Sequence, residues 1–401
     1  MSSWSRLAAL ASLVLLLGCP PDDGSVPQAF PVLDATPAPA EGSAPPAPGD
    51  DREVFRVCTI LPRSGPEVDT GAEIRRGIDI AISEIPNDAR RRFDWTHKDT
   101  KSTEGGALTA FQACFNEGHH AVIGPVAPAG TTALIPVAAA HDILLVVPQV
   151  AAAVPVGWSG SLVAISPPSL EMGRLAAENA RAARGLRKGA VLHVGSVFGT
   201  SLRDAFRDTF ESVEEGGVFV GARELPPDDP DAWAAAAKEL RAAGAEALFV
   251  VGPPDASKAV ARYVGTEDGV QAWFVDWSMQ PPVLEAAAPG GLNRVHWLNR
   301  NQPTGGFEGK YVQLHQAKPE FSAGSGYDAV KLLQLASEAS DSTWHEDLLK
   351  QIEGMKAIPS AFGTGAMVEQ GGVDFEDVGG YSVVEPKKMP DADVWIFGGH
   401  E

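Results

Sequence analysis

The chain has few basic residues, few aromatic residues and few cysteines. Its 401 residues include 32 basic and 52 acidic side chains, for a net charge of -20, with 7% aromatics and three cysteines. The one local basic cluster is Arg90–Arg92, which is too little positive charge for a nucleic-acid surface. Nucleic acid is therefore not an expected partner. The length and the 44% hydrophobic content instead indicate two or three globular units with sizeable cores.

Signatures of catalysis and of metal binding are also missing. The sequence contains no GxSxG, HExxH, CxxC, Walker, GxGxxG or EF-hand pattern. His119-His120 and the trio Asp94, His97 and Asp99 are the candidate metal ligands, but lone histidines at helix ends and strand edges are usually solvated. Ser64 is a loop serine with no spacing that requires a catalytic partner. We expect no enzyme, no metal and no cofactor.

A long apolar run occurs only at the N-terminus. Arg6 precedes the run from Leu7 to Leu17, which is too short to span a bilayer and predicts a signal peptide over residues 1–19. Residues 20–51 are rich in Pro and Ala, cannot bury a core and predict a disordered tether. The ending Leu16-Leu17-Gly18-Cys19 resembles the lipobox of bacterial lipoproteins. This resemblance implies a lipid on Cys19, membrane attachment in a bacterial envelope, and a globular part in the periplasm or outside the cell.

Cys58 and Cys114 remain as an even pair if Cys19 is lipidated. Cys58 lies on an expected strand and Cys114 on the apolar face of an expected helix. In an oxidising compartment they are candidates for a disulfide, and two buried free thiols are the alternative.

The stretch from Arg56 to Ile85 predicts a strand, a tight loop and an amphipathic helix in succession. Val57–Leu61 is an apolar run that ends at a Pro/Gly loop. Thr70 and Glu73 then have the spacing of a capping box. The apolar positions of the following segment fall on one helical stripe, which predicts a helix packed on a sheet.

The same strand–loop–helix alternation continues along the chain, first up to about residue 164 and again beyond it. Without hairpin signals this alternation predicts parallel sheets with right-handed crossovers, and thus an α/β fold. Further expected strands are Phe93–His97, Ala121–Gly124, Ile143–Val147, Ala190–Val194, Val218–Val220, Ala247–Val251, Trp273–Asp276 and Val295–Leu298. Leu162–Ser166 is expected to cross between two lobes. Ser102 or Thr103, Asp231 and Asp255 are the expected helix caps.

Several phrases resemble the type I periplasmic binding proteins, in particular the branched-chain amino-acid (leucine/isoleucine/valine) receptors of ABC transporters. They include the opening strand–loop–helix, AVIGP from Ala121, LLVVPQ from Leu144, FGTSLRDAF from Phe198 and GYDAVKLL from Gly326. The resemblance implies two Rossmann-like lobes with parallel sheets, joined by three crossings. One lobe would comprise residues 52–164 and 300–357, the other residues 165–299 and 358–388, and residues 389–401 would form a C-terminal tail.

Candidate ligand contacts follow the carboxyl ends of the expected strands, where open α/β sheets bind their ligands. They are Ser64, Gly65, Thr131, Thr132, Gln149 and Ala151 in one lobe, and Phe198, Asp276 and Trp277 in the other. Helix-opening threonines suit a carboxylate, and an opposing aspartate suits a zwitterion. Relative to the amino-acid binders, Pro128 lies near the position of an expected serine, Ala151 near that of an expected threonine, and Phe198 replaces a tyrosine.

These observations predict a lipid-anchored, extracytoplasmic solute-binding protein that holds an amino acid, amide or small carboxylate between its lobes. Its partner would be an ABC permease or an envelope sensor. The alternative is an envelope lipoprotein of the same fold that acts as a sensor, regulator or scaffold with a degenerate pocket.

Overall fold

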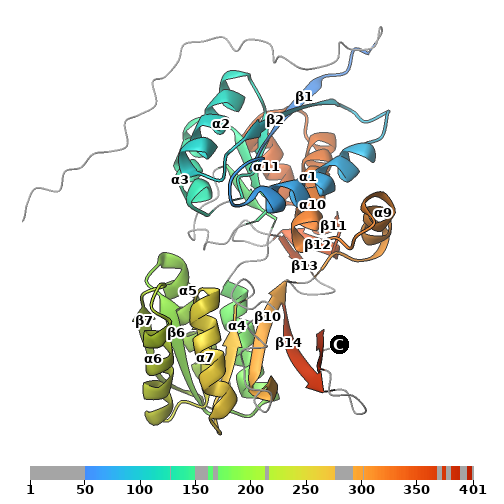
Figure 1. The fold of residues 1–401 in the computed structure, drawn as a ribbon. Helices are drawn as coiled ribbons and strands as arrows, with labels where there is room; N and C mark the ends of the chain where they lie inside the picture. The colour runs from blue at the N-terminus through green and yellow to red at the C-terminus, as the bar shows by residue number, and fades with distance from the viewer. Residues whose placement is uncertain are drawn as a thin grey trace, which may run out of the picture. The chain divides into compact units, whose positions relative to one another are not determined.

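Two large sheets and the helices that pack on them make up the computed structural model (Figure 1). The structure describes residues 50–126, 128–149, 161–165, 170–212, 216–275, 292–300, 302–367, 373–375, 381–388 and 395–399. We call the five-stranded sheet with its helices the first lobe, and the seven-stranded sheet with its helices the second lobe. The α/β class and the two-lobed type I binding-protein fold predicted from the sequence are confirmed.

The first-lobe sheet is parallel throughout and has the order β2-β1-β3-β4-β5. Its strands are β1 (Val54–Leu61), β2 (Arg92–Asp99), β3 (Ala121–Ile123), β4 (Leu144–Val147) and β5 (Leu162–Ala164). The segment expected to cross between lobes therefore begins as a fifth strand, which pairs with β4. Its three residues are buried and apolar, so they complete the sheet before the chain leaves it.

Helices cover both faces of this sheet (Figure 1). α2 (Glu104–Asn116) and α3 (Pro128–Ala140) pack against the face that contains Cys58 and Ile60. α1 (Val68–Ser83), α9 (Gly305–His315), α10 (Phe321–Ala339) and α11 (His345–Glu353) contribute to the core on the other face. The lobe is thus assembled from two parts of the chain that are far apart in sequence.

Glycines allow α1 and α10 to approach closely. A Cβ at Gly77 would lie 1.8 Å from the carbonyl oxygen of Ala323, and one at Gly326 would lie 2.3 Å from that of Ile74. Any larger residue at either position would push the two helices apart. Gly77 and Gly326 therefore allow the short distance at which α10 packs against α1.

A disulfide lies on the opposite face of the sheet from this helix pair. It joins Cys58 of β1 to Cys114 of α2, with 5.9 Å between the two Cα atoms. Both residues are fully buried among apolar neighbours. The disulfide therefore links β1, an interior strand of the sheet, to the helix that covers it.

The capping box expected at Thr70 and Glu73 is wrong. α1 begins at Val68, its N-cap is Glu67, and no side chain caps it. Glu73 accepts instead from the Tyr311 hydroxyl of α9 and from Arg76. The Glu73 carboxylate, which the local spacing had assigned to the helix cap, thus binds to a helix that is distant in sequence. At α2, by contrast, the expected cap is confirmed, because the N–H of Gly106 donates to Thr103 Oγ1 at 3.0 Å.

The second-lobe sheet has the order β15-β14-β10-β9-β8-β6-β7. Its strands are β6 (Lys188–Val194), β7 (Val218–Leu225), β8 (Ala247–Val251), β9 (Gln271–Phe274), β10 (Val295–Arg300), β14 (Tyr381–Lys388) and β15 (Trp395–Gly399). The five strands β6 to β10 pair in parallel, whereas β14 and β15 add antiparallel pairs. The C-terminal segment that sequence analysis left as a tail thus contributes a strand.

The helices of the second lobe are α4 (Leu170–Glu178), α5 (Val197–Ser212), α6 (Pro230–Ala242) and α7 (Pro254–Thr266), with a π-helix at Asn179–Ala183. Both expected caps among them are wrong. Asp229, not Asp231, accepts from the N–H of Ala232 and opens α6. Asp255 lies inside the first turn of α7 and pairs with Lys258. In each case a proline begins the helix one position earlier than the expected cap.

A small antiparallel sheet, β11 (Ile358–Ser360), β12 (Gly363–Met367) and β13 (Val373–Phe375), follows α11. Ile358, Ala361 and Phe362 are buried in the first-lobe core. The domain boundary predicted between residues 357 and 358 remains a prediction.

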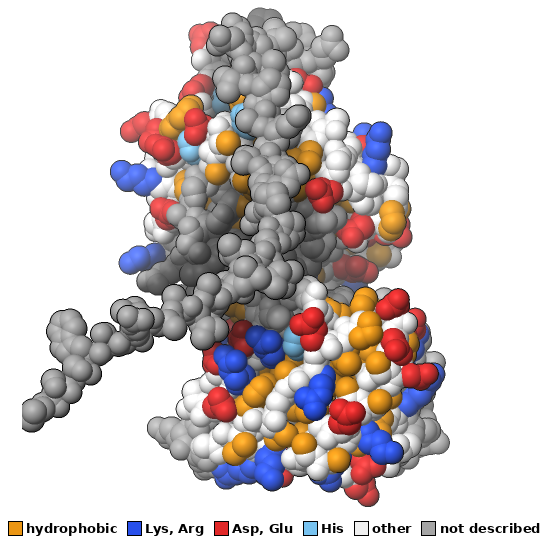
Figure 2. Space-filling view, turned by 90° about the vertical axis from the view of Figure 1, so that its left-hand side faces the viewer, with side chains coloured by type: hydrophobic (Ala, Val, Ile, Leu, Met, Phe, Trp, Pro, Cys, Tyr) orange, Lys and Arg blue, Asp and Glu red, His pale blue; other side chains and the backbone are white. Residues whose placement is uncertain are grey.

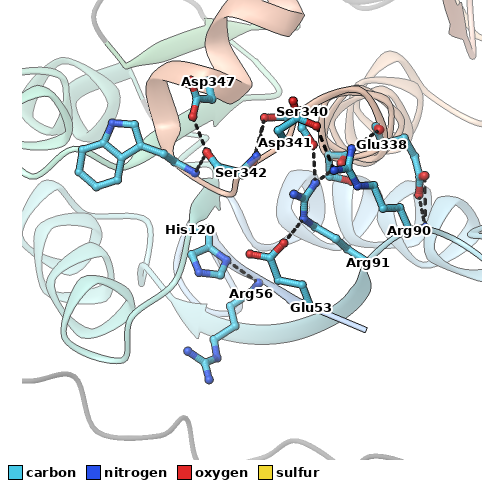
Figure 3. Close-up of polar contacts among 12 residues, drawn as sticks. Glu53, Arg56, Arg90, Arg91, His120, Glu338, Ser340, Asp341, Ser342 and Asp347 are labelled. Carbon is cyan, nitrogen blue, oxygen red and sulfur yellow. Dashed lines mark hydrogen bonds and ion pairs between the residues drawn. The ribbon is translucent and has the colours of Figure 1, made fainter. Parts of the chain in front are cut away.

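A buried guanidinium fixes the start of β1. Arg91 is 1% exposed; its Nε donates to Glu53 at 2.7 Å, and its Nη1 donates to the carbonyls of Ser337 and Ser340 near the end of α10 (Figure 3). Beside it, the N–H of Arg56 donates to Nδ1 of His120 at 3.1 Å. The place where the chain enters the first lobe is thereby tied to the C-terminal end of α10.

The described surface that Figure 2 presents mixes acidic and basic side chains. It offers no continuous basic face in that view, in keeping with the acidic composition. Among the described helices, none combines the length and the apolarity needed to cross a membrane.

Candidate functional site

The loops at the carboxyl ends of β1 and β2 are bound to each other. Asp99 accepts from the N–H groups of Arg63 and Lys101, each at 2.8 Å, and from the Ser64 hydroxyl at 2.8 Å. Desolvation opposes ionisation of Asp99, but these hydrogen bonds outweigh it and lower its pKa. Gly65 has φ of +88°, and a Cβ there would lie 2.7 Å from the carbonyl oxygen of Lys101. Ser64 and Gly65 therefore shape this loop pair.

Thr131 and Thr132 lie in α3, which follows β3. The helix begins at Pro128, three residues before Thr131, so Thr131 ends its first turn and Thr132 follows that turn, whereas sequence analysis had placed both threonines at the opening. Thr131 is buried, whereas Thr132 is exposed. Of the two, Thr132 offers its side chain at the surface.

Gln149 follows β4 and reaches α10. Its Nε2 donates to Oγ of Ser322 at 2.5 Å, and Ser322 lies in the first turn of α10. Ser325, one turn further along, donates to the carbonyl of Ser322. Sequence analysis missed Ser322; the run FSAGSG at the start of α10 was the available signal, because small polar residues gather there.

The remaining predicted contacts are only partly described. Phe198 lies in the first turn of α5, after β6, and is partly buried against a second-lobe core cluster. Ala151, Asp276 and Trp277 lie outside the described residues, as does Cys19. The structure thus places Ser64, Gly65, Thr131, Thr132 and Gln149 after β1, β3 and β4 of one sheet, and Phe198 after β6 of the other.

The histidines considered as metal ligands are engaged in the fold. His119 and His120 are largely buried rather than solvated as expected, and desolvation lowers the pKa of His120 to about 4. Nδ1 of His119 lies 2.9 Å from the carbonyl oxygen of Cys114. Nδ1 of His97 lies 2.6 Å from Oγ1 of Thr59. Within the described residues, no group of three potential ligands is arranged to hold a metal ion.

A cavity of about 510 Å³ lies in the first lobe, among residues of β1, the loop after it, α1 and β2. Its lining includes Thr59, Leu61, Pro62, Arg63, Val68, Gly71, Ala72, Arg75, Asp79, His97 and Lys98. None of the residues predicted to contact the ligand lines it.

Comparison with protein families gives a match over most of the chain. A model described as "Periplasmic binding protein" matches residues 55–383, which includes strands of both large sheets. The chain belongs to this family. The resemblance seen in the sequence is thereby confirmed, whereas among curated proteins no relative matches.

Solved periplasmic binding proteins share the fold at low sequence identity. A leucine-binding protein from Thermotoga maritima is 20% identical, with 86% of this chain and 97% of that chain covered and a TM-score of 0.66. An ABC transporter solute-binding protein from Rhodopseudomonas palustris, in complex with 4-hydroxybenzoate, is 19% identical, with 87% and 96% covered and a TM-score of 0.69. An ABC transporter substrate-binding protein from Sphaerobacter thermophilus is 16% identical, with 86% and 96% covered and a TM-score of 0.70.

Proposed function

We propose that this periplasmic binding protein is the lipid-anchored solute receptor of an ABC-type importer. It holds a small polar solute, an amino acid, an amide or a small carboxylate, in the cleft between its lobes. The single observation that carries the proposal is the family match, because residues 55–383 include strands of both large sheets.

A carboxylate is the ligand group we favour. Structural neighbours are described as binding leucine, 4-hydroxybenzoate or benzoate, and a carboxylate is common to all three. In this chain, the exposed Thr132 and the amide of Gln149 supply hydrogen-bonding groups beyond the strands of the first lobe. We assign Asp276, Trp277, Ala151 and Phe198 as further contacts on the sequence argument, with Asp276 facing an ammonium or amide group.

A thermal-shift screen tests the proposal. The purified protein is scanned against amino acids, amides and small carboxylates, including leucine and 4-hydroxybenzoate. A ligand at about 100 times its dissociation constant stabilises the folded state by about 2.7 kcal/mol, which is measurable as a rise in Tm. Thr132→Ala and Asp276→Ala are expected to weaken any hit, whereas the exposed second-lobe control Glu239→Ala is not.

The screen also separates the two functions that the sequence allows. No shift from any compound contradicts the receptor proposal and favours the ligand-free sensor, regulator or scaffold. A hit that survives both substitutions means that the residues are wrongly assigned. The anchor is tested by membrane fractionation, in which Cys19→Ala is expected to release the protein into the soluble fraction.

A further inference from the structure

The cavity of about 510 Å³ in the first lobe has no assigned role. It lies between α1 and the edge strand β2, and all the residues that line it belong to segment 59–98. The site proposed above uses residues of both lobes, whereas this cavity is lined by residues of one lobe only. Its occupation therefore does not depend on lobe closure.

A hydrogen-bonded polar pair, Thr59 and His97, forms part of the lining, at a position of β1 where the neighbouring side chains are apolar. Thr59 is 1% exposed and lies on the face of β1 whose other members, Val57 and Leu61, belong to the apolar core. Its Oγ1 is 2.6 Å from Nδ1 of His97, its neighbour across the two strands. When the Thr59 hydroxyl donates to Nδ1, the neutral imidazole carries its proton on Nε2, which leaves Nε2 as a hydrogen-bond donor.

The charged residues of the lining favour an anion. Three cations and one acid line the cavity, in a chain where acidic residues outnumber basic ones 52 to 32. Arg75 pairs with Asp79 at 2.7 Å and Lys98 with Glu117 at 2.5 Å, while Arg63 makes no ion pair with the described part of the chain. Arg63 and Arg75 line the cavity together with His97, and besides desolvation their positive charges lower the pKa of its ring.

The remaining lining is apolar and held in place. Leu61 and Pro62 are buried, whereas Val68 is 37% exposed and is one of the few large apolar side chains exposed in the described part of the chain. A Cβ on Gly71 would lie 2.1 Å from the carbonyl oxygen of Pro62, so α1 is pressed against the loop after β1.

We propose that this cavity binds a small organic carboxylate with an apolar body. The carboxylate lies between the Arg63 guanidinium and Nε2 of His97, and the body packs on Leu61, Pro62 and Val68. The volume lies within the range of small-molecule sites, roughly 300–1,000 Å³. The alternative is a water-filled groove beside an edge strand. That alternative does not account for the three cations in the lining or for the exposed Val68.

Histidine NMR on the purified protein provides a readout at the site itself. The His97 ring signals are followed while sodium benzoate, sodium acetate or benzyl alcohol is added. Benzoate is expected to shift them and to raise the pKa of His97, which desolvation lowers to about 4, because a nearby carboxylate favours the imidazolium ion. The groups already facing this ring are Arg75 and Arg63, which lower its pKa, and Asp79, which raises it. Acetate should bind at least ~10-fold more weakly than benzoate, and benzyl alcohol should leave the ring unaffected.

Two variants separate this site from the cleft between the lobes. Arg63→Ala should weaken the benzoate response of His97 at least ~10-fold, whereas Arg207→Ala, which removes an exposed guanidinium of the second lobe, should leave it unchanged. Thr132→Ala tests the cleft and should also leave it unchanged, even if the proposed receptor function fails. Arg63 is exposed, so circular dichroism is expected to show an intact fold in its variant.

Three results would overturn the inference. The first is a His97 signal that does not move at ~10 mM benzoate, a concentration that fills a site of millimolar affinity. The second is an equal response to acetate and benzoate, which would remove the role of the apolar walls. The third is a benzoate response that persists in Arg63→Ala.

Discussion

Side-chain hydrogen bonds and ion pairs of the first lobe join very distant parts of the chain, whereas those described in the second lobe join parts that are closer in sequence. Glu84 of α1 accepts from Lys310 and Tyr327, which are 226 and 243 residues away, and Arg91 reaches Ser337, 246 residues away. In the second lobe, Arg294 pairs with Asp268, 26 residues away, and that carboxylate is 99% exposed.

The two lobes face different costs of assembly. Most of the second lobe is contiguous, from β6 to β10, and the buried Trp233 donates from Nε1 to the carbonyl of the nearby Pro226 at 2.8 Å. Helices α9 to α11 belong to the first-lobe core, but in the sequence they follow most of the second lobe, so the chain must return to the first lobe. Bringing these helices back costs more chain entropy, since closure entropy grows with loop length. Buried ionic and hydrogen-bonded contacts then specify where the returning helices seat.

The largest expected effect comes from removing the disulfide of the first lobe. The double variant Cys58→Ser/Cys114→Ser is expected to lose about 4 kcal/mol in free energy of unfolding, because a sequence separation of 56 residues closes a long loop. Urea unfolding measures the loss. Reductant should lower the stability of the wild type to a similar extent and should not affect the variant.

Hydrogen exchange localises the same effect. Amides of β1 and α2 should exchange faster in the double variant, while those of the second-lobe strand β8 should keep their protection. An equal change in both lobes would contradict the comparison, since it would mean that the two lobes unfold as one unit.

The next effect concerns Asp328, a buried carboxylate of α10. It accepts from the Ser360 hydroxyl at 2.5 Å and from the N–H of Ala361 at 2.8 Å. Asp328→Ala leaves both donors buried without an acceptor and is expected to cost about 3 kcal/mol in free energy of unfolding. The second-lobe control Asp255→Ala, whose carboxylate is 77% exposed, should cost less than about 0.5 kcal/mol. Equal losses would remove the distinction between the lobes.

Asp328 also predicts a pH dependence. Desolvation raises its pKa from 3.8 to about 7, so the folded state binds this proton more tightly than the unfolded state does. The resulting stability is fully present below about pH 4 and is lost as the pH rises through about 7. Relative to Asp328→Asn, the wild type should therefore lose Tm between pH 5 and pH 8. Parallel Tm curves for the two proteins would show that Asp328 does not titrate in this range.

A smaller effect with the opposite pH sign is expected at Glu84. Desolvation opposes its ionisation, but Lys310, Tyr327 and Lys331 together lower its pKa from 4.5 to about 2. Glu84→Gln should cost about 2 kcal/mol, discounted because Lys310 is partly exposed.

The pH sign at Glu84 follows from its lowered pKa. The contribution is present above about pH 4.5 and lost as the pH falls toward 2, so the stability difference between wild type and Glu84→Gln should vanish in acid. Urea unfolding at several pH values measures it. Glu239→Gln, which removes a carboxylate paired with Arg223 in the second lobe, provides the matched control. A control loss as large as that of Glu84→Gln would argue against a special role for first-lobe ion pairs.

Local patterns predicted the strands well. Ala247–Val251 was expected as a strand and forms β8 with those bounds, because five consecutive apolar residues between polar breaks specify a buried parallel strand. Thr103 caps α2 as expected, since its hydroxyl acts within three residues. The family resemblance supplied the return of the late helices to the first lobe.

Local sequence patterns could not predict the contacts between segments that are distant in the chain. Glu73 has capping-box spacing, yet it bonds to Tyr311, and nothing near either residue marks the other. For the candidate site, Gln149 was placed correctly after a strand, but its partner Ser322 lies 173 residues further along. A side chain chooses the best partner in the folded molecule, and local sequence reports only the partners within a few residues.

The direction of β1 has a mechanical consequence. The chain enters this strand at Val54, beside the ion pair of the buried Arg91 with the exposed Glu53, and the strand lies between β2 and β3. A pull on the preceding residues along the strand axis therefore loads the whole ladder of eight residue pairs with β2 in shear, rather than peeling one pair at a time. Under the anchoring proposed at Cys19, force from the membrane would reach β1 in this direction, at the opposite end of the strand from the loop at Ser64.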